Sequence, residues 1–189
     1  TCGVNKDGKA FFPLMPYFGY NNLTQEDLYS IVAYVRSLQP IVNEIPETEL
    51  NFPLNLIVKT LPLQSYQPMQ EPDKNNSVEY GKYLVTIAGC YDCHTQQVKG
   101  EFITEKSYAG GFEFHLPGGV LQSANITPDK ITGIGNWTKA QFISRFTTFI
   151  MPWTMYAGMT EEDLGAIFDY LKTVNPVYNS VALWSPNKK

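Results

Sequence analysis

The string C-Y-D-C-H from Cys90 to His94 constrains this chain more than any other stretch of its 189 residues. Two cysteines three positions apart, followed at once by a histidine, form the pattern of c-type haem attachment. The two thiols lie one helical turn apart, so each can form a thioether with a haem vinyl group, and the next side chain then lies under the iron. The pattern predicts Cys90 and Cys93 as attachment residues and His94 as the proximal iron ligand.

Two other kinds of site use the same residue types. A thioredoxin-like dithiol would follow a strand, whereas residues 78–89 have the pattern of a helix that ends at a glycine. A zinc site would need further ligands, and only Cys2 and His115 remain among the cysteines and histidines. Haem attachment is the favoured interpretation, with Cys2 as a free thiol and His115 as a less favoured alternative iron ligand.

A gap-free internal repeat is the second informative feature. Residues 14–41 align with residues 150–177, and each copy has Met-Pro followed by a Thr with an Asp three positions later. The Thr and Asp are typical of a helix N-terminus. The repeat predicts two amphipathic helices, each with one buried apolar stripe. The stripes are Leu28, Ile31, Val35 and Leu38 in the first copy and Leu164, Ile167, Leu171 and Val174 in the second.

The methionines of the Met-Pro pairs are the candidate sixth iron ligands. A thioether is a soft donor that stabilises ferrous iron and raises the reduction potential. Met155 and Met159 are close to Met151 in sequence, but they have no methionine counterpart in the first copy. Met151 is therefore the predicted sixth ligand of the haem, and Met15 is its counterpart for a second haem.

Four blocks of sequence carry a resemblance to a known family. They are G-K-Y-L-V from Gly81, C-Y-D-C-H-T from Cys90, N-I-T-P-D-K-I-T-G-I-G-N-W-T from Asn125, and M-P-W with the following T-E-E-D-L. With them the chain resembles bacterial dihaem class I cytochromes c, particularly the cytochrome subunits of membrane alcohol and aldehyde dehydrogenases. The resemblance covers nearly the whole chain. It implies an all-α class I cytochrome c fold, His/Met-ligated haem, and electron transfer from a dehydrogenase or quinol-oxidising complex towards a terminal oxidase.

The predicted organisation is one complete haem domain and the C-terminal half of a second. Residues 1–42 are expected to be the C-terminal part of a first cytochrome c domain. Residues 43–75 are expected to be an extended, Pro-rich linker, and residues 76–189 a cytochrome c domain with covalent haem. No C-x-x-C-H precedes Met15. We therefore expect a longer natural protein that supplies this motif upstream, further residues near 147–150, and a signal peptide or membrane anchor.

Several features within the predicted haem domain are expected to serve the cofactor. A helix over residues 76–88 contains Gly81, which would allow close crossing of the terminal helix. Residues 99–132, rich in Gly, Pro and aromatic residues, are expected to form a loop that wraps a flat apolar cofactor. Trp137 and Arg145, in a helix that begins at Trp137, are candidates to hydrogen-bond a haem propionate, with simple burial as the alternative.

The net charge of the chain and the predicted ligation of the iron limit which classes of function are expected. A formal net charge of -4 and a pI near 5.2 argue against nucleic acid and permit a basic partner. Covalent haem implies a periplasmic protein, or a membrane-associated one that faces the periplasm. The favoured function is electron transfer without substrate chemistry or catalytic residues, because both axial iron positions are filled. The alternatives are a haem enzyme such as a cytochrome c peroxidase and a haem-wiring subunit of a larger respiratory complex.

Overall fold

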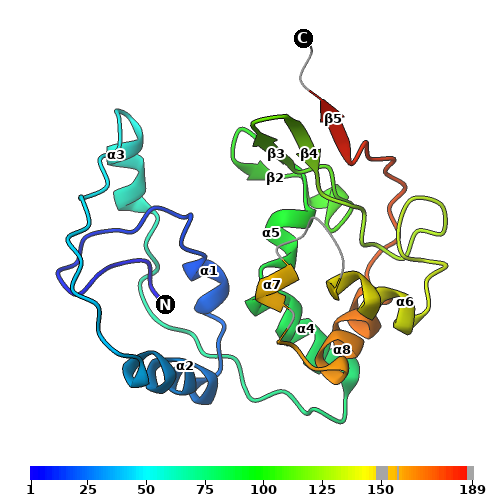
Figure 1. Ribbon diagram of the computed structural model, residues 1–189, viewed down its shortest axis with the longest axis horizontal. Helices are drawn as coiled ribbons and strands as arrows, with labels where there is room; N and C mark the ends of the chain where they lie inside the picture. Colours follow the sequence, from blue (N-terminus) through cyan, green and yellow to red (C-terminus); the bar gives the residue numbers. More distant parts are fainter. Residues whose placement is uncertain (148–152, 157, 187–189) are drawn as a thin grey trace. The chain divides into compact units, whose positions relative to one another are not determined.

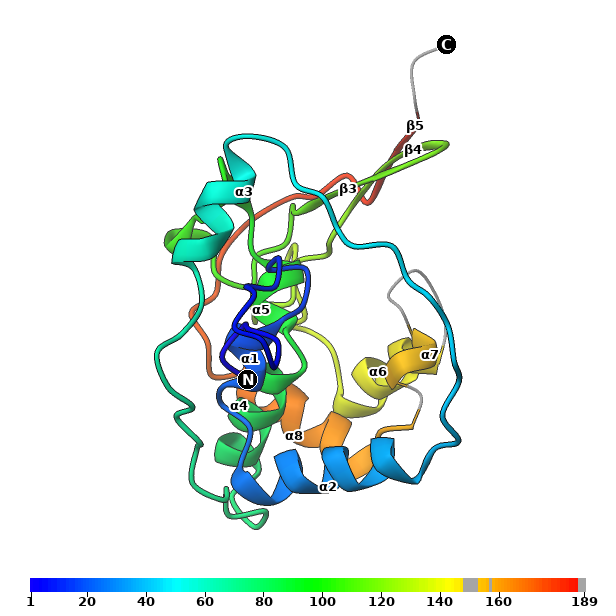
Figure 2. The same ribbon diagram turned by 90° about the vertical axis from the view of Figure 1, so that its left-hand side faces the viewer.

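The computed structural model describes residues 1–147, 153–156 and 158–186. The chain forms two compact units, Thr1–Glu71 and Pro72–Lys189, which run from blue to cyan and from green to red in Figure 1, with a perpendicular view in Figure 2. Among the described helices, none has both the length and the hydrophobicity needed to cross a lipid bilayer.

The first unit is built from short helices. It contains α1 (Tyr17–Tyr20), α2 (Gln25–Ser37), α3 (Leu54–Ile57) and the 3-10 helix η1 (Val58–Thr60). α2 begins where the sequence predicts, because the Thr24 hydroxyl accepts a 3.1 Å hydrogen bond from the Asp27 backbone N–H.

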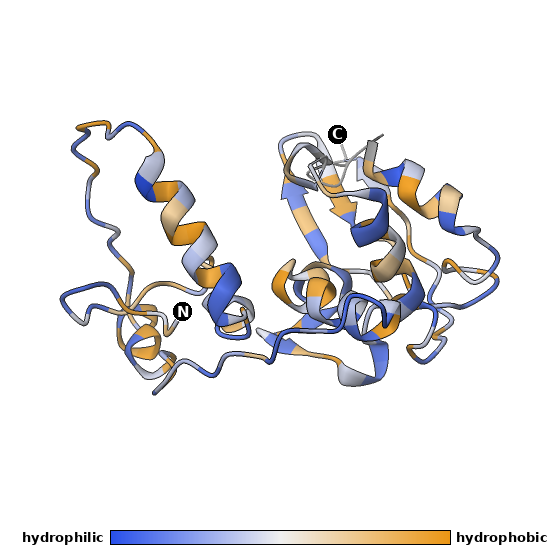
Figure 3. Cartoon of the chain, turned by 90° about the horizontal axis from the view of Figure 1, so that it is seen from below, coloured by the Kyte–Doolittle hydropathy of each residue, from blue (hydrophilic) through white to orange (hydrophobic). Residues whose placement is uncertain are grey.

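The apolar stripe of α2 is exposed, which differs from the prediction of a buried stripe. Hydrophobic and hydrophilic residues alternate in bands along this helix (Figure 3). Ile31 is 48% exposed and Val35 57% exposed, whereas their counterparts Ile167 and Leu171 in the second copy are 2% and 1% exposed. The two copies of the repeat thus share their local pattern but differ in what covers it.

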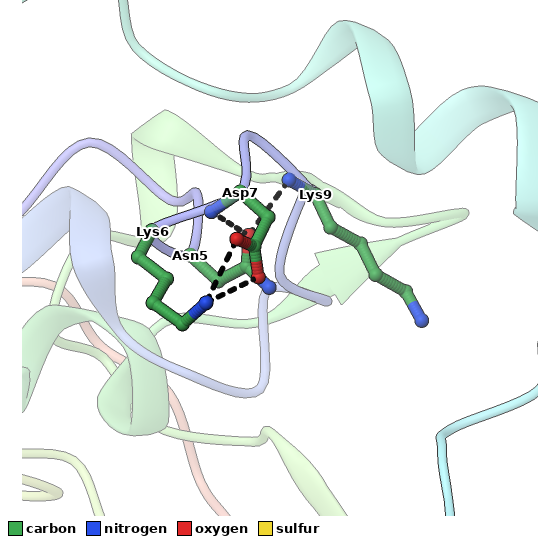
Figure 4. A network of polar contacts seen from close by, with 4 residues as sticks. All are labelled: Asn5, Lys6, Asp7 and Lys9. Carbon is green, nitrogen blue, oxygen red and sulfur yellow. Dashed lines mark hydrogen bonds and ion pairs between the residues drawn. The ribbon is translucent and has the colours of Figure 1, made fainter.

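A tight turn near the N-terminus is held by one side chain. The side-chain oxygen of Asn5 accepts backbone hydrogen bonds from Asp7 and Lys9, both at 2.9 Å (Figure 4). Gly8 supplies the left-handed conformation that this turn requires, with φ of 79°. The polar segment is therefore ordered by its own hydrogen bonds.

Short helices interrupt the predicted extended linker, residues 43–75. Pro53 lies at the N-cap of α3, where its missing N–H breaks no helical hydrogen bond. The apolar run that follows ends in Val58, which is buried. The proline-rich segment therefore contains helical turns and one buried apolar side chain.

Six short helical elements form the frame of the second unit. They are α4 (Ser77–Ile87), α5 (Cys90–His94), α6 (Lys139–Ser144), the 3-10 helix η3 (Arg145–Thr147), α7 (Trp153–Tyr156) and α8 (Glu161–Leu171). The α4 and α8 starts match the sequence prediction: Asn76 caps α4, and Thr160 and Asp163 form a capping box on α8. α6 begins at Lys139 rather than Trp137, because Thr138 is its N-cap.

α4 and α8 cross closely and provide much of the core. Tyr83 and Val85 of α4 and Ile167 and Leu171 of α8 are nearly inaccessible to solvent. A Cβ atom on Gly81 would overlap the backbone carbonyl of Ala166. The predicted close crossing at Gly81 is confirmed.

The prediction of an all-α fold is wrong, because the second unit also contains two antiparallel sheets. One pairs β1 (Gln97–Val98) with β2 (Glu101–Phe102); the other has the order β3 (Glu113–Leu116), β4 (Gly119–Gln122) and β5 (Trp184–Pro186). His115 pairs with Val120, and Val120 pairs with Ser185. Three of the strands, β2, β3 and β4, and the 3-10 helix η2 (Thr104–Lys106) lie within the predicted wrapping loop, residues 99–132, so the fold is mixed.

The strands have a local cause and a distant one. The residues Leu116, Pro117, Gly118 and Gly119 connect β3 and β4 through a tight turn, which favours a hairpin. The third strand comes from the end of the chain, where the Trp184 side chain lies against Gly118 and Gly119. Replacement of either glycine by a larger residue would place a side chain against the Trp184 indole.

Candidate haem site

The haem-attachment motif forms a helix of its own. Gly89 adopts a left-handed conformation with φ of 67°, which ends α4 and begins α5 at Cys90. Within α5, residues three positions apart lie on the same side of the helix. Cys90 and Cys93 therefore share one side, as attachment to two vinyl groups of one porphyrin requires.

His94 is held in one orientation by the backbone of another segment. Its Nδ1 lies 2.8 Å from the carbonyl oxygen of Ala124. A carbonyl oxygen only accepts, so Nδ1 carries the proton and Nε2 keeps its lone pair for a metal. Burial lowers the pKa of His94 despite this hydrogen bond, which favours the neutral imidazole that can act as a ligand.

The thiols do not have the properties of a redox dithiol. Burial, and secondarily the neighbouring Cys93, raises the pKa of Cys90 to about 12, and burial also raises the pKa of Cys93. A thioredoxin-like pair needs a lowered thiol pKa, because the thiolate is the nucleophile. Cys2, Cys90 and Cys93 form no disulfide with one another.

A zinc site has no structural support either. Within residues 1–147, 153–156 and 158–186, no three His, Cys, Asp or Glu side chains are grouped to hold a metal ion. His115 lies on β3 with its side chain 76% exposed, 3.7 Å from Glu113. The arrangement of Cys90, Cys93 and His94 fits covalent haem better than either alternative.

Hydrogen bonds around Thr95 and Gly110 anchor the backbone of His94 within the second unit. Thr95 is fully buried, and its hydroxyl accepts a 3.1 Å hydrogen bond from the Tyr108 N–H. The Gly110 N–H donates to the His94 carbonyl at 2.8 Å. The backbone of the proximal residue is therefore fixed independently of its side chain.

Asn125 organises the segment that contains Ala124. Its side-chain N–H groups donate to the Thr132 hydroxyl at 2.9 Å and the Val177 carbonyl at 2.8 Å. Its side-chain oxygen accepts from the N–H and the hydroxyl of Thr127, at 2.9 and 2.8 Å. Asn125 is only 5% exposed, so this network is a rigid support for the carbonyl that orients His94.

Trp137 and Arg145 come together beside α6. The Arg145 guanidinium carbon lies 5.2 Å from the centre of the Trp137 ring, a cation–π contact. Trp137 is half-buried and Arg145 is exposed. Their role as propionate partners stays a prediction.

The candidate sixth ligands are found in different settings. Met15 precedes α1 in the first unit and is 47% exposed, and Met155 of α7 is 80% exposed. Met159 is half-buried next to α8. Met151, the predicted ligand, lies outside the described residues, so its ligation stays a prediction.

Sequence reasoning missed two residues of this site, Ala124 and Gly110. Ala124 contributes only its backbone carbonyl, which any residue type could supply. Gly110 has a left-handed φ of 73°, and the pair of glycines at 110–111 was the only sequence signal of an unusual backbone there.

Several known proteins are similar to this chain over most of its length. No protein-family model matches the sequence. The chain is 30% identical over 206 residues to the cytochrome c subunit of alcohol dehydrogenase (quinone) from Gluconacetobacter polyoxogenes, a match that covers 93% of this chain and 42% of that protein. It is 28% identical to the fructose dehydrogenase cytochrome subunit from Gluconobacter japonicus, over 91% of this chain and 39% of that protein.

A diheme cytochrome c-type protein from Cereibacter sphaeroides is also 28% identical, over 91% of this chain and 62% of its own length. The chain spans about two fifths of the length of the alcohol and fructose dehydrogenase subunits. These similarities confirm the resemblance that the sequence motifs indicate.

Proposed function

We propose that this chain, a homologue of dehydrogenase cytochrome c subunits, is an electron-transfer subunit with covalent haem c. The observation that carries the proposal is the 2.8 Å contact between His94 Nδ1 and the Ala124 carbonyl, next to two cysteines on one side of α5. It leaves Nε2 as an oriented nitrogen ligand. Bound haem supplies a reversible one-electron couple.

Each residue of the site has a separate task in this proposal. Cys90 and Cys93 would hold the haem covalently, with each thiol adding across one vinyl group to give a thioether. His94 donates its Nε2 lone pair, and Met151 is the proposed sixth ligand. Trp137 and Arg145 are proposed to hydrogen-bond a propionate.

Covalent attachment is tested by acidic organic extraction of the denatured protein. The haem should stay with the polypeptide, and it should become extractable only when both Cys90→Ala and Cys93→Ala are present. Haem that leaves the unmodified chain would overturn the proposal. Replacement of Cys2 by Ser is the matched control, because that thiol lies outside the motif and should not affect retention.

We further propose that the natural protein holds a second haem, ligated by Met15. Two properties of the first unit support this. The α2 stripe is exposed, whereas the equivalent α8 stripe packs against α4 next to the haem motif. The Tyr17 hydroxyl is buried without a hydrogen-bond partner among the described residues, a costly arrangement unless another group completes it.

The number of haems is tested by mass spectrometry of the protein purified from its source, compared with its gene. A second C-x-x-C-H upstream of Met15 and the mass of two attached haems are expected. A mature chain that begins at Thr1 with a single haem would contradict the second site without affecting the first.

The proposed partners are redox proteins on the periplasmic side of a membrane. The relatives are cytochrome subunits of dehydrogenases, which supports a dehydrogenase as electron donor. A quinol-oxidising complex is the alternative proposed donor, and a terminal oxidase is the proposed acceptor. Stopped-flow mixing should show haem reduction by the donor and oxidation by the acceptor, at rates that depend on ionic strength. Peroxide turnover by the isolated protein that is lost while Met151 is bound to the iron and regained when Met151 dissociates would instead favour an enzyme.

A further inference from the structure

Gly110 contacts both His94 and the segment that orients the His94 ring. Its backbone N–H donates to the His94 carbonyl at 2.8 Å. On its other side it packs against the Ala124 peptide, whose carbonyl accepts the hydrogen bond from the His94 ring. One glycine therefore contacts both the backbone of the proximal residue and the group that orients its side chain.

The contact between Gly110 and Ala124 leaves no room for a side chain. A Cβ atom at position 110 would lie 2.5 Å from the Ala124 carbonyl carbon and 2.6 Å from its oxygen, and it would overlap the Ser123 carbonyl oxygen. Real Cβ atoms do not approach backbone atoms this closely, so either residue 110 or the Ala124 carbonyl would have to move.

Backbone hydrogen bonds hold the segments on both sides of this contact. The Ser123 carbonyl accepts from the Gly111 N–H at 2.9 Å, and the Ile126 N–H donates to the Tyr108 carbonyl at 2.9 Å. The residue after Ala124 is Asn125, which is anchored by the hydrogen-bond network described above. The Ala124 carbonyl is thus held between Gly110 on one side and Asn125 on the other.

We propose that Gly110 is a positioning residue that sets the Ala124–His94 hydrogen bond and, through it, the reduction potential of the haem. The proposal rests on the proposed function, in which His94 Nε2 ligates the iron. The Nδ1–H···O=C bond makes Nε2 a stronger donor, and a stronger donor favours ferric iron and lowers the potential. Displacing the carbonyl weakens the donor and raises the potential.

The test compares two neighbouring glycines in the haem-loaded protein. Gly110→Ala brings a Cβ into the Ala124 carbonyl. Gly111→Ala is the matched control, because Gly111 also has a left-handed φ of 86°, but its Cβ would meet only Asn179 at 3.5 Å and Gln96 at 4.0 Å. Both variants carry the same type of backbone strain and keep the backbone N–H of residue 111 that donates to the Ser123 carbonyl, but only Gly110→Ala places a Cβ against the Ala124 carbonyl.

Two readouts separate positioning from a loss of stability. Spectroelectrochemistry should show that Gly110→Ala shifts the ratio of reduced to oxidised haem at least threefold at the wild-type midpoint, about 28 mV at 59 mV per tenfold change for one electron. Proton NMR of the reduced protein should show faster solvent exchange of the His94 Nδ1 proton. Gly111→Ala should change neither.

Unchanged potential and exchange in Gly110→Ala, or equal changes in Gly111→Ala, would overturn the proposal. If Gly110→Ala does not accumulate, Asn179→Ala replaces it, because the Asn179 side-chain N–H donates to the Ala109 carbonyl at 2.9 Å and supports the same turn. It should raise the potential and speed exchange to a smaller extent, and no change in either would count against the role of Gly110. Haem that is not covalent in the wild type would overturn the proposed function instead.

Discussion

Gly81 of α4 lies so close to Ala166 of α8 that a side chain at position 81 would occupy the space of the Ala166 carbonyl oxygen. The Cβ of Tyr170, one turn further along α8, would be 3.0 Å away. This contact fixes how near the two helices lie, and α4 leads directly into α5 and the haem-attachment cysteines. Packing between these helices therefore bears on the site as well as on stability.

Gly81→Ala should lower the free energy of unfolding. Alanine gains about 1 kcal/mol in helix propensity, but forced overpacking against backbone costs about 1–3 kcal/mol or more, so a net loss of about 1–2 kcal/mol is expected in urea titrations followed by circular dichroism. Gly165→Ala is the control in α8, since its Cβ would meet the flexible Lys139 side chain at 3.2 Å. A Gly81→Ala protein as stable as the control would contradict the close crossing.

The link between Tyr80 and Asp163 should make the stability of the second unit depend on pH. The Tyr80 hydroxyl donates to the Asp163 carboxylate at 2.6 Å. Burial acts to raise the pKa of Asp163, but hydrogen bonds from Tyr80 and Thr160 outweigh it and lower the pKa below the ordinary 3.8. A carboxyl group with a lowered folded-state pKa stabilises the fold above its unfolded pKa, and this stability is lost as the pH falls through the folded value.

Asp163→Asn should therefore lower the free energy of unfolding by about 1 kcal/mol at neutral pH. The difference from wild type should shrink as the pH falls below about 4, where the wild-type carboxyl is protonated. Urea titrations across this pH range measure the effect. Glu162→Gln removes a charge from the same turn, and its effect should not follow this pH profile; a pH-independent Asp163→Asn difference would refute the linkage.

The network around Asn125 should be sensitive to a single substitution. Asn125→Ala removes four hydrogen bonds and leaves the buried Thr127 N–H without its acceptor, so a loss of about 2–4 kcal/mol is expected in denaturant titrations. Asn136→Ala, at an exposed position with one hydrogen bond to the Lys130 carbonyl, should change stability by less than about 0.5 kcal/mol. Similar losses in both variants would mean that the network does not support the loop.

The sequence predicts those parts of the fold that depend on neighbouring residues. Helix starts at Asn76 and Thr160 follow from side chains that bind N–H groups three residues away. The haem motif is likewise contained in five consecutive residues. In each case the interacting groups are encoded close together, so the pattern alone identifies them.

Parts that depend on distant residues were not predictable. β5 pairs with β4 across about 60 residues of chain, and no local sequence pattern near Trp184 indicates that β4 is its partner strand. The hydrogen bond from His94 to Ala124 uses a backbone carbonyl, which has no signature in residue type. The exposure of the α2 stripe also depends on what covers it, and the stripe itself looks the same as that of α8.

Ligation by Met151 is the prediction that decides the redox chemistry of the site. Met151→Ala should remove the absorption band that arises from methionine–iron charge transfer, and it should lower the reduction potential, because the soft thioether that favours ferrous iron is lost. Met155→Ala and Met159→Ala are matched controls that each remove one nearby thioether. Met155 is 80% exposed, so its replacement should affect neither property. If the band and the high potential persisted without Met151 but disappeared with Met155 or Met159, the assignment from the internal repeat would be wrong and the sixth ligand would be that other methionine.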